Sequence, residues 1–164
     1  MRAQWVLLSA LGAAVIGVGW LLFGDMLRWL VASWLTDPNY SHGFLVPFIA
    51  AFFFWRARDS FRERRPSTLG LVGLAFALLL HLAATPLRIY PLSALAFVLS
   101  LAALTLLVWG MPALRAGRYA FITLALMIPV PFIDRVSPLL EAFTAQAAAA
   151  SVSLVGTQAL TLGS

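Results

Sequence analysis

The chain lacks two residue types entirely and carries little charge. Cysteine is absent from its 164 residues, which excludes a disulfide, a thiolate metal ligand or a cysteine nucleophile within this sequence. Lysine is absent too, so arginine supplies all eleven basic side chains. Charged residues make up only 10% of the chain, whereas an ordinary soluble domain has about 25%. This scarcity of charge predicts a protein that lies in a membrane.

Apolar residues make up 62% of the chain, and its mean hydropathy is +0.95. A helix that spans a bilayer needs roughly 20 apolar residues, and we expect five transmembrane helices, at residues 3–23, 43–55, 69–84, 92–109 and 119–128. Two amphipathic helices are expected to lie in the membrane interface, at residues 24–35 and 137–156. A short basic loop is expected at residues 111–118. The predicted fold class is all-α, a polytopic membrane helix bundle that forms a single membrane domain over residues 1–164.

The arginines are divided unevenly between the two sides of this predicted bundle. With the N-terminus inside, the inner side holds eight arginines and the outer side three, as the positive-inside rule requires. The inner set is Arg2, Arg56, Arg58, Arg62, Arg64, Arg65, Arg115 and Arg118, and the outer set is Arg28, Arg88 and Arg135. We therefore expect a cytoplasmic N-terminus. Topology and contact with anionic lipid headgroups, rather than nucleic acid, account for the net charge of +5.

The most informative stretch is Trp-Leu-Thr-Asp-Pro-Asn-Tyr-Ser-His-Gly-Phe-Leu-Val-Pro, hereafter the 34–47 segment. Five of six consecutive positions in it are polar: Asp37, Asn39, Tyr40, Ser41 and His42. Polar groups at a membrane boundary are costly unless they are hydrated or paired, so this cluster indicates a functional role. The predicted topology places the segment on the outer face.

Ser41 and His42 are adjacent, which suggests a catalytic dyad. Neighbours in sequence do not face each other on a helix, and on a strand they point to opposite faces, so a dyad within this pair is disfavoured. His42 has two open roles. It either bonds a loop carbonyl or caps the second span, or it serves an outer site with a partner from elsewhere, as a proton carrier near neutral pH.

Pro47 and His81 lie inside predicted spans. Pro47 removes a backbone N–H about five residues into the second span. It can simply kink the helix, or it can in addition free a carbonyl near Gly43 to bind a substrate or a water. His81 is ionisable and deep in the third span, which makes it a functional candidate, yet a neutral histidine bonded to a backbone or hydroxyl group is the more frequent outcome. The two histidines belong to different depths and no zinc motif is present, so we expect no metal and no cofactor.

These residues make the chain resemble the exosortase/archaeosortase family. The resemblance rests first on the 34–47 segment, followed by an apolar run to Trp55 and an arginine-rich loop. Its second element is Ile-Pro-Val-Pro at residues 128–131, followed by a polar-flecked helix that contains Gln146 and ends in Leu-Val-Gly156. The resemblance covers essentially the whole chain.

The resemblance implies a multi-span enzyme of the bacterial inner membrane that processes C-terminal sorting signals of exported proteins. Such a signal joins a Pro-Glu-Pro-type motif, a hydrophobic helix and a basic tail. A cysteine attacks the peptide at the outer face and passes the acyl group to an acceptor, assisted by arginines in later spans. The lipid bilayer and the sorting-signal helix are the expected partners. The resemblance also suggests the substrate-positioning groups, which are Asp37, Asn39, Tyr40, Ser41 and His42.

The chain departs from the family pattern because it has no cysteine, which relatives place downstream of the Gly156 region. We expect the N-terminal portion of a membrane cysteine protease or transpeptidase, cut before the nucleophile and inactive alone, so whether this chain is an enzyme stays open. One alternative is a non-catalytic binding or assembly subunit for hydrophobic C-terminal helices. A small transporter or channel piece is a further alternative, which is disfavoured because His81 is the single deep ionisable residue.

Overall fold

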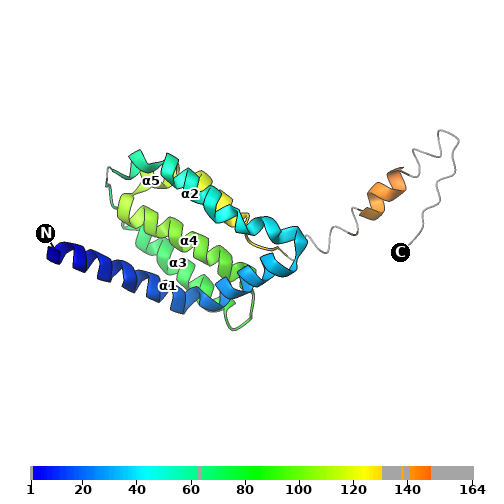
Figure 1. Ribbon diagram of the computed structural model, residues 1–164, viewed down its shortest axis with the longest axis horizontal. Coiled ribbons are helices and arrows are strands. Elements are labelled where there is room, and N and C mark those ends of the chain that lie inside the picture. Colours follow the sequence, from blue (N-terminus) through cyan, green and yellow to red (C-terminus); the bar gives the residue numbers. More distant parts are fainter. Residues whose placement is uncertain (1, 63, 131–137, 139–140, 149–164) are drawn as a thin grey trace. The chain divides into compact units, whose positions relative to one another are not determined.

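The computed structural model describes residues 2–62, 64–130, 138 and 141–148. All regular secondary structure in this part of the chain is helical, which confirms the all-α class. The chain divides into two compact units, Met1–Pro129 and Val130–Ser164. The first unit is drawn in Figure 1 and contains α1 (Arg2–Thr36), the 3₁₀ helix η1 (Pro38–Phe44), α2 (Val46–Arg56), the 3₁₀ helix η2 (Arg58–Phe61), α3 (Leu69–Ala84), α4 (Tyr90–Trp109), α5 (Met111–Ala116) and α6 (Arg118–Ala125).

The first helix is one continuous element of 35 residues. The separate interfacial helix predicted at residues 24–35 is therefore wrong, because no proline interrupts the chain there and α1 runs on to Thr36. One stripe of its second half is buried: Phe23, Met26, Leu30 and Trp34. The ion pair between Asp25 and Arg28, with 3.3 Å between Oδ1 and Nη1, lies on the exposed side. The amphipathic pattern thus marks a helix that packs against the rest of the bundle.

The second predicted span begins with the end of η1, and α2 itself starts only at Val46, with Pro47 in its first turn. Pro47 therefore opens the helix, and the predicted interior kink at Pro47 is wrong. Proline is well suited to this position because a first-turn N–H has no intrahelical acceptor to lose. The N–H of Leu45 donates to the carbonyl oxygen of His42 over 2.9 Å, which makes η1 continue directly into α2.

α3 and α4 form the most extensive helix pair of the first unit and run in opposite directions (Figure 1). α3 has the predicted bounds, and α4 begins two residues before the predicted Leu92, with Pro91 in its first turn. Gly70 permits a close approach of the two helices, because a Cβ there would collide with the backbone of Leu107. Many of the buried residues of α4 are small: Ser93, Ala94, Ala96, Ser100 and Ala103. Small residues at such an interface let helices in a membrane pack closely.

The basic loop predicted at residues 111–118 is wrong for most of its length, because α5 occupies it with Pro112 in its first turn. The preceding Gly110 has φ of 84°, a backbone conformation that favours glycine. A Cβ on Gly110 would also collide with the carbonyl oxygen of Arg65. The N–H of Arg65 donates to the carbonyl oxygen of Trp109 over 3.2 Å, so the arginine-rich loop is tied to the end of α4.

The helices of the first unit run back and forth between two ends (Figure 1). One end, hereafter the arginine end, holds η2, α5 and the termini of the helices beside them, and its members include Arg56, Arg58, Arg62, Arg64, Arg65, Arg115 and Arg118. Phe61 and Trp109 meet there, with 5.5 Å between ring centroids. The other end, hereafter the η1 end, holds the end of α1, η1 and the turn between α3 and α4. Arg28 and Arg88 lie toward it, so these nine arginines divide seven to two between the ends, in the sense that the sequence predicts.

Among the described residues, two stretches are long and apolar enough to cross a membrane, Gly17–Thr36 within α1 and Tyr90–Trp109, which is α4. α3 is a shorter apolar helix. The 11 residues of α2 extend only about 17 Å, less than the hydrocarbon core of about 30 Å. The count of five transmembrane helices, like the single domain over residues 1–164, stays a prediction.

The amphipathic helix predicted at residues 137–156 falls in the second unit, where the structure describes only part of it. Residues 141–148 are helical and their side chains are exposed. Ser137 and Gly156, the predicted ends of this helix, lie outside the described residues, and so does Arg135.

Candidate functional site

Trp34 anchors the 34–47 segment to a distant part of the chain. Its side chain lies on the buried stripe of α1 and is 8% exposed. The indole Nε1–H donates to the carbonyl oxygen of Met127 over 3.0 Å. Met127 follows the end of α6 and precedes Pro129. Carbonyl groups at the end of a helix have no N–H partner within the helix, so the Met127 carbonyl can accept from the indole. The bond therefore joins the end of α1 to the end of α6.

Gly43 lets η1 lie directly against this anchor. A Cβ on Gly43 would collide with the Trp34 indole atoms Nε1, Cδ1 and Cε2. The ring of Phe44 packs edge-on against the same indole, with 5.2 Å between ring centroids. The glycine is therefore a spacing requirement of the Trp34 contact.

Local hydrogen bonds shape η1. The Asp37 carboxylate accepts the N–H of Asn39 over 2.9 Å and caps the 3₁₀ helix, as aspartate commonly does at a helix start. Pro38 stands in the first turn. The Ser41 hydroxyl donates to the carbonyl oxygen of Pro38 over 2.9 Å. Asp37 and Ser41 thus stabilise the turn itself, which the sequence did not predict for them.

The five predicted site residues lie together on this one turn, but they differ in exposure. Tyr40 is buried, at 9% exposed, and Asp37 is half-buried. Asn39, Ser41 and His42 are exposed. Because the Ser41 hydroxyl hydrogen goes to a backbone carbonyl, the pair Ser41–His42 has no dyad geometry here, as adjacency predicts. The site residues that this turn exposes are therefore Asn39, Ser41 and His42, and the Ser41 hydroxyl hydrogen is used within the turn.

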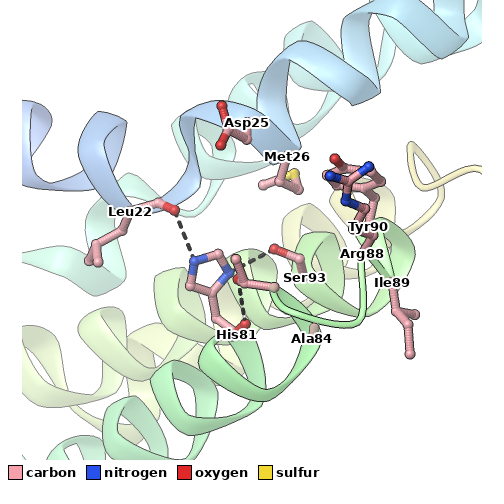
Figure 2. Close-up of a pocket in the computed structure, with 10 residues that line it drawn as sticks. Leu22, Asp25, Met26, His81, Ala84, Arg88, Ile89, Tyr90 and Ser93 are labelled. Carbon is pink, nitrogen blue, oxygen red and sulfur yellow. Dashed lines mark hydrogen bonds between the residues drawn. The ribbon is translucent and has the colours of Figure 1, made fainter.

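His81 is a second polar centre, and Figure 2 shows how it is held. Its ring is 5% exposed and lies 4.2 Å, between centroids, from the ring of Phe23. Nε2 lies 2.8 Å from the carbonyl oxygen of Leu22, and Nδ1 lies 2.7 Å from the hydroxyl of Ser93. A carbonyl oxygen only accepts, so Nε2 carries a proton, and in the neutral ring the Ser93 hydroxyl donates to Nδ1. His81 is thus bonded to a backbone and a hydroxyl group, the outcome that the sequence favours.

A small cavity of about 40 Å³ lies between α1 and the α3–α4 turn, beside His81. Asp25, Thr85, Arg88 and Tyr90 are among the residues that line it (Figure 2). The Thr85 hydroxyl donates to the carbonyl oxygen of His81 over 2.8 Å. Both ring nitrogens of His81 already have protein partners, so the ring joins α1, α3 and α4 and has no free nitrogen to offer a ligand.

Sequence reasoning missed the residues that position the site. The sequence marks Trp34 only as the start of a motif, and it marks Gly43 only as the start of a span and the place of a carbonyl that Pro47 could free. An indole N–H at the end of a long apolar helix indicates a buried acceptor, because buried tryptophan usually finds one. The acceptor itself, 93 residues away, has no signal in the sequence.

Apolar helices that run between two chemically different ends, one rich in arginine and one carrying a capped polar turn, are the arrangement expected of a helical membrane protein. The family model of transmembrane exosortases matches residues 34–164. The chain therefore belongs to the transmembrane exosortase family, and the resemblance predicted from its motifs is confirmed. The match begins at Trp34, the anchor of the polar turn. No curated protein and no solved structure that was compared matches the chain.

Proposed function

We propose that this chain supplies the outer-face substrate site of a membrane transpeptidase or protease that processes C-terminal sorting signals of exported proteins. The observation that carries the proposal is the arrangement of η1. Asn39 and His42 project from a turn that Trp34, Gly43 and the Asp37 cap hold in one conformation. Side chains held on a fixed turn can position a substrate peptide, because little conformational freedom is lost when they bind it.

The five residues of the proposed site have different roles. His42 and Asn39 contact the substrate backbone, since imidazole and amide groups can both donate to a peptide carbonyl. Asp37 and Ser41 keep the turn in shape through their bonds to the Asn39 N–H and to the Pro38 carbonyl. Tyr40 is a buried support of the same turn. Donors near the scissile carbonyl would also stabilise a developing oxyanion.

The proposed orientation places the N-terminus in the cytoplasm of a bacterial cell and the η1 end outside the inner membrane. Its support is the division of the described arginines between the two ends, together with the preference of lysine and arginine for cytoplasmic loops. Under this orientation η1 meets the signal of an exported protein where its hydrophobic helix leaves the bilayer.

The thiolate of the proposed reaction is not among these 164 residues, because the sequence has no cysteine. That same observation favours a second candidate, a non-catalytic subunit that binds or assembles hydrophobic C-terminal helices. The two candidates differ in what the loss of His42 changes. A substrate-positioning role predicts slower processing, whereas an assembly role predicts weaker retention of the substrate helix.

The test is His42→Ala introduced at the native gene in its own cell, with a reporter that carries a tripartite C-terminal signal. We expect processing of the reporter, followed by its size on a gel, to fall at least tenfold while the protein stays in the membrane in normal amount. The matched control is Thr36→Ala. Thr36 is an exposed neighbour whose hydroxyl bonds only the Ala32 carbonyl of its own helix, so processing should be unchanged.

Normal processing by the His42→Ala protein would refute the positioning role of His42. Processing that stays normal even when the gene is deleted would refute the proposed function as a whole. The assembly subunit would be supported instead if the His42→Ala protein no longer co-purified with the uncleaved reporter, while the reporter that stayed bound was processed at the normal rate.

A further inference from the structure

We propose that a groove at the arginine end binds the phosphate headgroup of an anionic phospholipid. The groove lies between α2, η2, α5 and α6 and has a volume of about 390 Å³. Its lining residues are Phe53, Arg56, Ala57, Ser60, Ala116 and Tyr119. The site is at the opposite end of the first unit from η1, so it is independent of the proposed substrate site.

The polar lining of the groove has the chemistry of a phosphate site. Arg56 is exposed at the end of α2, and Ser60 is half-buried in η2. A guanidinium and a hydroxyl can both donate to phosphate oxygens, and a guanidinium can do so through two N–H groups at once. The third polar group is the phenol of Tyr119, whose oxygen accepts a hydrogen bond from Arg118 Nη2 over 2.9 Å. Because that bond uses the phenol oxygen as acceptor, the Tyr119 O–H is left to donate to a ligand.

Charge around the groove also favours an anion. None of the six lining residues is acidic. The neighbouring Asp59 pairs with Arg62, with 3.5 Å between Oδ1 and Nε, and its side chain is 71% exposed. Residues 56–65 hold five arginines and two acidic residues, and Arg115 and Arg118 lie next to the lining residues Ala116 and Tyr119 in the chain. A cluster of arginines beside a membrane attracts anionic lipid with about 1 kcal/mol per side chain.

Two exposed aromatic side chains, Tyr119 in the groove and Trp55 next to Arg56 in the chain, favour a position of the groove at the surface of a bilayer. Trp55 is 62% exposed and Tyr119 is 52% exposed. Each carries a guanidinium over its ring: Arg58 lies 4.6 Å from the Trp55 ring centroid, and Arg118 lies 4.7 Å from that of Tyr119. Tryptophan and tyrosine concentrate where headgroups meet acyl chains, and an arginine over an aromatic face is held there by cation–π attraction.

The apolar surface beside the groove indicates a lipid rather than a soluble phosphate. Phe53 and Ala57 form part of the groove wall. On the same helix, Phe48 and Phe52 are 73% and 51% exposed, and a surface of this kind in a membrane protein is covered by acyl chains. A phospholipid satisfies both parts, with its phosphate at Arg56 and its chains along α2, whereas inorganic phosphate satisfies only the polar part.

The experiment uses the full chain, purified in neutral detergent and mixed with phosphatidylglycerol or phosphatidylcholine, with bound lipid counted by native mass spectrometry. We expect several-fold more phosphatidylglycerol than phosphatidylcholine to remain bound. Arg56→Gln should lower phosphatidylglycerol retention about fivefold, as the loss of one arginine at a membrane surface predicts. Tyr119→Phe should lower it less, because the ring remains.

The matched control is Arg28→Gln, which removes an exposed arginine at the η1 end, where it pairs with Asp25. Its lipid retention should equal that of the unaltered protein. Equal losses in Arg56→Gln and Arg28→Gln would overturn the proposal in favour of a general charge effect. Arg56→Lys keeps the charge and should retain more phosphatidylglycerol than Arg56→Gln, and an unchanged unfolding temperature of Arg56→Gln without lipid excludes a folding defect.

A second arm separates the two sources of phosphate. Inorganic phosphate or glycerol phosphate, added at millimolar concentration without lipid, should not raise the unfolding temperature of the protein, whereas phosphatidylglycerol should. A rise of the same size with inorganic phosphate would overturn the assignment to lipid. Processing of a sorting-signal reporter does not enter either readout, so failure here and failure of the proposed function are distinguishable.

Discussion

The indole N–H of Trp34 and the carbonyl oxygen of Met127 are joined by a buried hydrogen bond of 3.0 Å. This bond connects the end of α1 to the residues that follow α6, and η1 begins only four residues after Trp34. The position of the polar turn therefore depends on a contact between parts of the chain that are 93 residues apart.

Trp34→Phe should weaken this link, because it removes the indole N–H but keeps an aromatic ring at this position. The phenyl ring keeps most of the apolar contact, but the Met127 carbonyl is left without the indole donor. A buried acceptor left unpaired costs about 1–3 kcal/mol, so we expect a clearly lower midpoint of thermal unfolding in detergent. Trp20→Phe is the control, because Trp20 is 53% exposed and should unfold like the unaltered protein. A loss confined to Trp20→Phe would contradict the role of the Trp34 bond.

Gly43→Ala should displace η1 from the indole of Trp34. The added Cβ would collide with the ring, and overpacking of this kind typically costs about 1–3 kcal/mol. Near-ultraviolet circular dichroism, which reports on fixed tryptophans, should change together with stability. Gly17→Ala is the matched control, since a Cβ there meets nothing within 4 Å and alanine is the better helix former by roughly 0.5–1 kcal/mol. Equal stability of the two variants would show that the close approach is unimportant.

His81 and Ser93 should behave as one coupled pair. His81→Phe preserves a ring beside Phe23 but leaves the buried Ser93 hydroxyl without its 2.7 Å partner, and an unpaired buried hydroxyl costs about 1–3 kcal/mol. Ser93→Ala removes the other half of the bond. The double variant should then lose less stability than the sum of the single variants, as residues that share a hydrogen bond do. Strict additivity in the free energies of unfolding would rule out this coupling.

The absence of cysteine makes the proposed topology directly testable. Any single cysteine placed in this chain is its only thiol. Asn39→Cys, in exposed η1, should react with a membrane-impermeant maleimide in intact cells that have a permeable outer membrane. Arg62→Cys, exposed at the arginine end, should react only after the inner membrane is opened. The reverse pattern would show that the orientation is inverted. Labelling of both sites in intact cells would refute the prediction that the two ends lie on opposite sides of the membrane.

Much of the helical plan was predictable because its causes are local. Apolar runs bounded by proline, glycine and arginine predict helices wherever they occur, and α3 has the predicted bounds from Leu69 to Ala84. The division of arginines between the two ends follows from counting them along those helices. The bonding of His81 to a hydroxyl and a backbone group was also expected, because a polar group buried in an apolar helix must find a partner.

The predictions were wrong where one local sequence pattern is compatible with more than one tertiary structure. The polar and apolar alternation at residues 24–35 fits an interfacial helix and fits equally well a helix with one buried face. Pro47 fits a kink and fits a helix start, and only the backbone before it decides which. Asp37 and Ser41 fit substrate contacts as residue types, yet in the fold their side chains bond the backbone of η1.

The sequence by itself determined the membrane character, the helical class, the family and the polar 34–47 segment, since composition and short motifs carry all four. Only the tertiary structure decided that Trp34 meets Met127, that Gly43 lies under the indole, and that Leu22 and Ser93 hold His81. The physical reason is that contacts between residues distant along the chain depend on how helix faces pack. A periodic pattern indicates which face of a helix is buried, but it does not indicate which residues that face contacts.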